Sequence, residues 1–199
     1  MHISEGVLNA PVLITGAGLA LAGTAIGLKQ MDYDRVAHVG VMSAAFFVTS
    51  LIHFNIGPAS THLILNGLIG LVLGWAVFPA ILVALILQAV FFQFGGLTTL
   101  GVNTLIMALP AVACYYVFGK MLQRSDFRLM LAAFGCGALS VLGSTLMLGA
   151  ALVLAEENFW TVSGIIIAAN IPVMIIEGIV TAFCVAFIKK VSPEILMNS

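Results

Sequence analysis

The sequence predicts an all-α integral membrane protein with about seven transmembrane helices, and two observations lead to this fold class. Hydrophobic residues make up 62% of the 199 residues and charged residues only 8%, whereas about 25% of a soluble domain is charged. A span needs about 20 mostly apolar residues, and the apolar runs leave room for six or seven spans. We therefore expect a single transmembrane domain over residues 1–199, embedded in a lipid bilayer.

Polar residues, glycines and prolines divide the apolar sequence into seven expected spans. These spans cover residues 9–28, 36–53, 62–78, 80–94, 102–119, 129–153 and 171–188. Lys29 ends the first span, Pro79 separates the third from the fourth, and the glycine-rich segment 95–101 separates the fourth from the fifth. Segment 156–170 begins polar and turns apolar, so we expect a short interfacial or re-entrant segment there.

The basic residues predict the orientation of the chain in the membrane, because Lys and Arg concentrate in cytoplasmic loops. With seven spans, all seven basic residues fall on one side: Lys29, Arg35, Lys120, Arg124, Arg128, Lys189 and Lys190. This distribution predicts a cytoplasmic C-terminus and an N-terminus outside. The N-terminal segment has no Lys or Arg before Val7, so we expect no cleavable signal peptide and a retained Met1.

Several function classes are disfavoured by what the sequence lacks. A net charge of −1 provides no basic surface for a nucleic-acid partner. The sequence contains no phosphate-binding loop, so we expect no ATP hydrolysis by the chain itself. It also contains no H-E-x-x-H or G-x-S-x-G motif, and we expect no enzyme activity. The three cysteines lie in apolar runs without C-x-x-C spacing, which is typical of buried packing residues.

Small residues recur at helical spacing in the first expected span, as Gly16, Ala20 and Thr24 show. Such faces let helices approach one another closely. We expect this stripe to pack inside the helix bundle, and the alternative is a docking face for another membrane subunit.

Three polar segments without helical character fall on the expected outer side: residues 1–6, 54–62 and 95–103. Irregular backbone at membrane depth is tolerated only where it is buried in protein or lines a cavity. The sequence therefore predicts an outward-facing pocket formed by these segments.

His2 is the residue that indicates what this pocket binds. The free amine of Met1, the amide nitrogen of His2 and Nδ1 of the His2 ring can close two fused, unstrained chelate rings on one ion. These three nitrogens lie in one plane, and a fourth would complete a square, which favours Ni²⁺ or Cu²⁺. The alternative interpretation is a solvated terminal histidine, since chain termini are commonly disordered.

Two further histidines are candidates for the fourth ligand. His62 begins the third expected span and His53 ends the second, so both are expected on the outer side. His38 lies near the first cytoplasmic loop and is expected to be a surface residue. Glu177 is the only acid well inside a span, which makes it either a functional residue or a protonated or hydrogen-bonded structural carboxyl.

Two other classes of membrane protein compete with a metal-binding protein. A b-type haem electron carrier needs paired histidines at one membrane depth, but His38 and His53 lie at opposite ends of one expected helix. A membrane component that binds a small organic vitamin needs groups to recognise it, and the chain has only two Trp and three Tyr.

Three motifs resemble the CbiM/NikM family, the substrate-binding (S) subunits of energy-coupling-factor ABC transporters for cobalt and nickel. Residues 1–6 (MHISEG) resemble the family's N-terminal M-H-I-x-[ED]-G, and residues 95–103 (GGLTTLGVN) match its G-G-L-T-T-L-G-x-N segment. Residues 171–178 match its I-P-x-x-x-x-E-G stretch. The order of the motifs is the same, and the resemblance runs from the first residue to about Lys190.

The resemblance implies a function in uptake of Co²⁺ or Ni²⁺, with Met1, His2 and His62 as metal ligands. It selects His62 over His53, because the family's histidine follows a small-residue loop. Thr98, Thr99 and Asn103 are expected to orient the ligands, or to cap the fifth span. The family also implies a transmembrane coupling (T) subunit and cytoplasmic ATPase subunits as partners, in the cell membrane of a bacterium or an archaeon. The sequence leaves cobalt and nickel both open.

Overall fold

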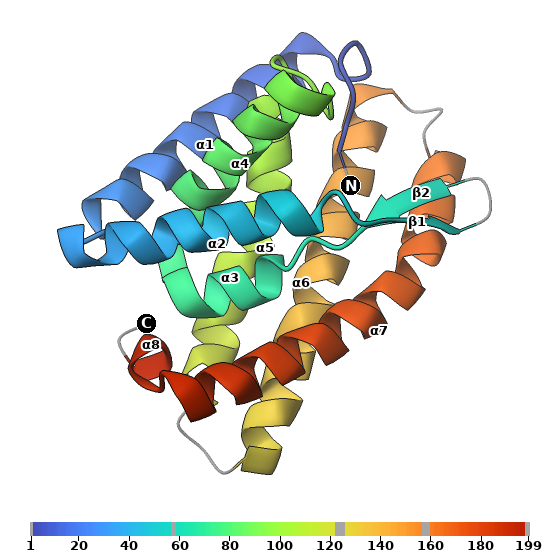
Figure 1. The fold of residues 1–199 in the computed structure, drawn as a ribbon. Helices are drawn as coiled ribbons and strands as arrows, with labels where there is room; N and C mark the ends of the chain where they lie inside the picture. The colour runs from blue at the N-terminus through green and yellow to red at the C-terminus, as the bar shows by residue number, and fades with distance from the viewer. Residues whose placement is uncertain (1, 57–58, 122–125, 157–159, 198–199) are drawn as a thin grey trace.

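The computed structural model describes residues 2–56, 59–121, 126–156 and 160–197, and it is almost entirely helical (Figure 1). Its helices are α1 Ala10–Lys29, α2 Val36–Thr49, α3 Asn66–Leu73, α4 Val77–Phe92, α5 Leu100–Phe118, α6 Asp126–Ala155, α7 Trp160–Val191 and α8 Glu194–Met197. Short 3₁₀ turns are η1 Tyr33–Arg35, η2 Gly74–Ala76 and η3 Gly119–Met121. The seven expected spans correspond in order to α1 to α7, which confirms the all-helical membrane fold class.

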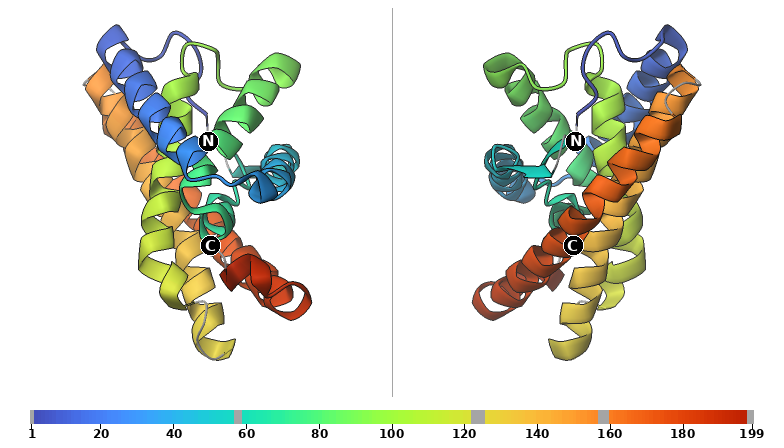
Figure 2. Two further views of the ribbon diagram at one scale, coloured as in Figure 1. Left: turned by 90° about the vertical axis from the view of Figure 1, so that its left-hand side faces the viewer. Right: turned by 90° about the vertical axis from the view of Figure 1, so that its right-hand side faces the viewer.

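Five helical stretches of the described chain are long and apolar enough to cross a membrane. They are Ala10–Lys29, Asn66–Phe92, Leu100–Met121, Phe127–Ala155 and Trp160–Val191. The remaining two expected spans are α2 and α3, of which α3 shares one stretch with α4. With 14 residues, α2 is about 21 Å long, which is shorter than the roughly 30 Å hydrocarbon core. Helix α2 packs mainly against α4, and Figure 2 shows it nearly end-on. The sides on which the termini lie stay a prediction.

The expected boundary between the third and fourth spans was wrong by several residues. The helical path breaks at Gly74, whose φ of +56° suits glycine, and the turn η2 follows. Pro79 instead lies within the first turn of α4, where backbone N–H groups have no intrahelical partner and a proline costs little. The proline therefore marks the start of a helix and not a break between two helices.

The segment between α2 and α3 contains a structure that the sequence did not predict. Strands β1 His53–Ile56 and β2 Ala59–His62 form an antiparallel hairpin, in which His53 pairs with His62. His53 therefore does not end a span and His62 does not begin one, because α3 starts only at Asn66. The prediction of a loop over residues 54–62 missed the hairpin because only Phe54–Ile56 alternates between apolar and polar residues, and the second strand is small and polar throughout.

The expected interfacial or re-entrant segment over residues 156–170 is also wrong. From Trp160 onward the chain belongs to the single 32-residue helix α7. The last span was expected to begin only at residue 171, but α7 runs through Pro172, since prolines are tolerated inside transmembrane helices. Helix α7 packs along α6, which precedes it in the chain (Figure 1).

The small-residue stripe of α1 packs inside the bundle, as expected. Gly16 faces Val102 of α5, Gly23 faces Phe78 of α4, and Gly27 faces the backbone of Trp75. In each case a Cβ atom would fall less than 2.6 Å from the neighbour. Gly18 lies on the other face of α1 and has no neighbour within 4 Å of such an atom.

Candidate functional site

The N-terminal segment folds back into the middle of the molecule instead of extending away from it. The segment that precedes α1 turns back from the end of that helix and runs inward between the other helices (Figures 1 and 2). Two apolar side chains anchor the segment, since Ile3 is 4% and Leu8 is 7% exposed. The burial of Ile3 places the neighbouring residue, His2, inside the protein. Met1 lies outside the described residues.

The start of α5 holds the backbone of Ile3. The Ile3 N–H donates to Oδ1 of Asn103 at 3.0 Å, and Nδ2 of Asn103 donates to the Ile3 carbonyl at 3.1 Å. The hydroxyl of Thr99 donates to the same carbonyl at 2.9 Å, and Nδ2 of Asn103 also donates to Thr99 Oγ1 at 3.2 Å. Asn103 and Thr99 are both buried. Their side chains thus fix the peptide that follows His2.

The glycine-rich segment before α5 fits against the same N-terminal residues. The N–H of Thr98 donates to Oε1 of Glu5 at 3.2 Å, so Thr98 acts here through its backbone. Gly95 has a φ of +75°, and a Cβ on it would lie 3.0 Å from Nδ2 of Asn103 and 3.6 Å from Cβ of His2. A Cβ on Gly96 would lie 1.9 Å from Cγ of Glu5. The glycines therefore let residues 2–5 approach the loop closely.

The rings of His2 and His62 lie against each other at the end of this segment. Their centroids are 4.8 Å apart and their planes are inclined by 20°. The His2 ring is also nearly parallel to the ring of Phe94, and the centroids of these two rings are 6.3 Å apart. The three expected polar segments therefore meet, since His2 belongs to the first, His62 to the second and the Gly95–Asn103 stretch to the third.

His62 is the last residue of β2, and its side chain is 3% exposed. Its Nδ1 lies 2.9 Å from the carbonyl oxygen of Leu63. The backbone of His53 pairs with that of His62 across the hairpin, but the side chain of His53 lies outside the described part of the structure. His38 is exposed on α2, as expected.

Glu177 projects from α7 into the segment that joins β2 to α3. Its carboxylate accepts hydrogen bonds from the N–H of Ile64 and from that of Leu65, the latter at 3.0 Å to each oxygen. The side chain is completely buried. The backbone N–H groups that hold the Glu177 carboxylate thus belong to residues close in sequence to His62.

Two parts of this site could not be found by inspecting side-chain motifs. Phe94 lies beside His2 but has no polar group to draw attention, and Ile3 contributes its backbone. Among the described residues, no group of three or more His, Cys, Asp or Glu side chains could hold a metal ion. A metal site here depends on backbone nitrogens beside two imidazoles.

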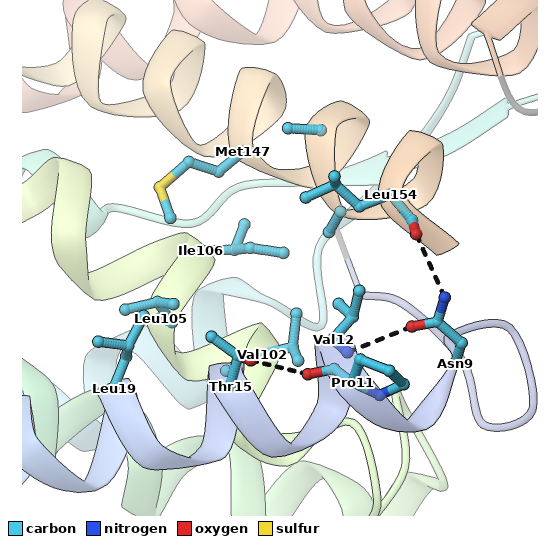
Figure 3. A pocket seen from close by; sticks show the side chains of 13 residues that line it. Asn9, Pro11, Val12, Thr15, Leu19, Val102, Leu105, Ile106, Met147 and Leu154 are labelled. Atoms are coloured by element: carbon cyan, nitrogen blue, oxygen red, sulfur yellow. Dashed lines mark hydrogen bonds between the residues drawn. The ribbon is translucent and has the colours of Figure 1, made fainter. Parts of the chain in front are cut away.

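A groove of about 420 Å³ lies away from the histidines, between α1, α5 and α6 (Figure 3). Its wall is mainly apolar, with Leu19, Ile106, Met147 and Leu154 among its residues. The Asn9 amide at its end donates to the carbonyls of Leu154 and Ala155 and accepts from the N–H of Val12. These bonds cap the start of α1 and the end of α6.

Comparisons with known proteins identify relatives over the whole chain. A model of the family described as CbiM, cobalt uptake substrate-specific transmembrane region, matches residues 2–195. The chain is 41% identical to a putative metal transport protein of Haemophilus influenzae, over 98% of this chain and 97% of that protein. It is 31% identical to the cobalt transport protein CbiM of Kyrpidia tusciae, over 100% of this chain and 87% of that protein.

A solved structure shares the fold. A crystal structure of a transition metal transporter matches with a TM-score of 0.78 at 22% identity, covering 100% of this chain and 96% of that one. This likeness extends over all the helices described above.

Proposed function

Because this chain belongs to the CbiM family of substrate-specific transmembrane components for cobalt uptake, we propose that it captures Co²⁺ or Ni²⁺ from the outer side of the cell membrane. The chain is a multi-pass membrane component of cobalt or nickel uptake. The observation that carries the proposal is the proximity of the His2 and His62 rings, whose centroids are 4.8 Å apart. Membership of a metal-uptake family leaves the haem carrier and the vitamin-binding component without support.

The proposed ligands are the amine of Met1, the amide nitrogen and ring Nδ1 of His2, and a ring nitrogen of His62. In this chelate the amide nitrogen occupies the middle position, so the fourth ligand takes the place next to the His2 ring. Two imidazoles in adjacent positions of one ion, with metal–nitrogen distances of about 2 Å, have ring centres roughly 4.5 Å apart. The observed separation of 4.8 Å is close to this value, and the two rings, which are stacked at 20°, would turn their nitrogens toward a shared ion on binding it.

Neighbouring groups support the proposed ligands. Asn103 and Thr99 hold the Ile3 peptide, and through it the position of His2. Thr98 holds Glu5 through its backbone. Groups that orient metal ligands in this way contribute to affinity because the ligands need not be ordered when the ion binds. His53 has no assigned part in the proposed site.

The energy for uptake must come from other subunits, because the chain has no phosphate-binding loop of its own. We propose that a transmembrane coupling subunit and cytoplasmic ATPase subunits supply it, in a bacterial or archaeal cell membrane. The proposed square of four nitrogens suits Ni²⁺, whereas the family description names cobalt, so both ions are tested below.

Titration calorimetry with Ni²⁺ and Co²⁺ tests the ligand set. We expect tight binding to the native chain, and at least a hundredfold weaker binding when three residues are added before Met1, because the amine is then too far from the His2 ring to share a chelate with it. We expect a comparable loss in His62→Ala. The matched control is His38→Ala, which removes an exposed histidine on α2 and should bind like the native chain. Native-like binding by the extended chain would show that the chelate is wrong.

A further inference from the structure

One peptide group beside the proposed metal site has both of its polar atoms engaged. This is the peptide that joins Leu63 to Ile64. Its carbonyl oxygen, on Leu63, lies 2.9 Å from Nδ1 of His62. Its N–H, on Ile64, donates to Oε1 of Glu177. A single rigid unit therefore connects a buried carboxylate on α7 to the ring of His62.

This connection specifies the tautomer of His62. A carbonyl oxygen can only accept a hydrogen bond, so Nδ1 of His62 must carry the hydrogen in this contact. In the neutral ring, Nε2 then has the lone pair. The nitrogen available to an ion is thus Nε2, and a metal-ligating histidine commonly donates its other N–H to a carboxylate or a backbone carbonyl.

The charge of Glu177 acts on the same peptide. The carboxylate is completely buried, and it accepts from the N–H of Ile64 and of Leu65. A negative group at the N–H end of a peptide polarises it and makes its carbonyl oxygen a better acceptor, and chains of hydrogen bonds strengthen one another in this way. The carboxylate therefore strengthens the bond from His62 Nδ1 to Leu63.

We propose that Glu177 is a positioning residue for His62, acting through the Leu63–Ile64 peptide to hold the ring as the Nδ1–H tautomer with Nε2 as the metal-binding atom. The inference rests on the proposed function, in which His62 is a ligand. It assigns to the buried acid of α7 a part in metal affinity in addition to its part in folding.

The tautomer is measured by nitrogen NMR of the metal-free protein labelled with ¹⁵N-histidine, with His62→Ala used to assign the signals. We expect the Nδ1–H form of His62 in the native chain. Glu177→Gln keeps the size of the side chain but removes its charge, and we expect a mixture of tautomers. The matched control is Thr181→Val, a buried residue one turn further along α7, which should give the native signal.

Nickel titration of the same variants tests the effect on binding. We expect Glu177→Gln to bind Ni²⁺ about 10- to 100-fold more weakly than native, and Thr181→Val to bind like native. In a His62→Ala background, Glu177→Gln should cause no further loss, because the ring that it positions is absent.

The two proposals fail in different ways. If His62→Ala binds like the native chain, the proposed ligand set is wrong. If His62→Ala loses binding but Glu177→Gln keeps the native tautomer and affinity, only the positioning role is wrong. An equal loss from Glu177→Gln with and without His62 would also overturn that role, because the effect would then be a general one on the fold.

Discussion

The side chain of Asn103 forms two hydrogen bonds with the backbone of one residue, Ile3, a hundred positions away in the sequence. Its Oδ1 accepts from the Ile3 N–H at 3.0 Å, and its Nδ2 donates to the Ile3 carbonyl at 3.1 Å. This pairing resembles that of two strands and needs no particular side chain at residue 3. It places the peptide between His2 and Ile3 relative to α5, and thereby the start of the chain relative to the helix bundle.

Asn103→Ala should weaken nickel binding by about 10- to 100-fold, because the segment that carries His2 loses both bonds to α5. The free energy of unfolding should fall by about 1–3 kcal/mol, since the buried N–H of Ile3 loses its partner while its carbonyl keeps only the bond from Thr99. Calorimetric titration and thermal unfolding in detergent measure the two effects. Thr104→Val is the matched control, because the Thr104 hydroxyl donates to the carbonyl of Leu100 in its own helix and not to the N-terminal segment. We call these two hydrogen bonds between Asn103 and Ile3 the Asn103 clamp. Equal nickel affinity in the two variants would show that the Asn103 clamp does not contribute to metal binding.

Gly95→Ala should disturb the Asn103 clamp from the glycine-rich segment, which lies against the side chain of Asn103. The left-handed backbone at Gly95 costs a residue with a side chain about 1–2 kcal/mol, and the new Cβ would lie 3.0 Å from Nδ2 of Asn103. We expect lower stability together with weaker nickel binding, measured by unfolding and titration. Gly40→Ala provides the control, since a Cβ there has no neighbour within 4 Å. A Gly95→Ala protein with native affinity would show that the Asn103 contact does not matter for the ion.

The sequence was sufficient for the membrane class and for the order of the helices, because apolar composition and span length report these properties directly. It was not sufficient for helix ends near Pro79 and Pro172, where one proline begins a helix and the other lies inside one. A proline has only a local effect on the backbone, and the neighbours that decide between these outcomes are distant in the sequence.

The candidate site shows the same division. His2 and His62 could be selected from their chemistry and from the resemblance to a family, and the structure brings their rings together. Phe94 and the hairpin of residues 53–62 could not be foreseen, because an aromatic residue in an apolar run and a short polar loop have no distinctive pattern. The partners of Glu177 are backbone groups, which no side-chain motif reveals.

Metal affinity should decrease as the pH falls, because an amine, an amide nitrogen and imidazoles must all lose or lack protons in order to bind the ion. Each ligand that must release a proton contributes about a tenfold loss per pH unit below its titration range. Nickel titrations between about pH 8 and pH 6 measure the slope, and calorimetry in two buffers of different ionisation enthalpy counts the protons released. The chain with three residues added before Met1 should release fewer protons, because its amine and the His2 amide no longer share a chelate with the His2 ring. An affinity that is independent of pH would exclude coordination by backbone nitrogens.

Gly27→Ala should destabilise the bundle, whereas Gly18→Ala should not. A Cβ on Gly27 would lie 2.4 Å from the carbonyl oxygen of Trp75 and 2.8 Å from Cδ of Pro79. These atoms are backbone and ring atoms that cannot rotate away, so α1 must move off its neighbour at a cost of about 1–3 kcal/mol. Gly18 has open space around it, and alanine there is neutral or stabilises the helix by up to about 1 kcal/mol. Thermal unfolding of both variants in detergent measures the difference. Equal stability of the two variants would mean that close packing of the small-residue stripe does not hold α1 in the bundle.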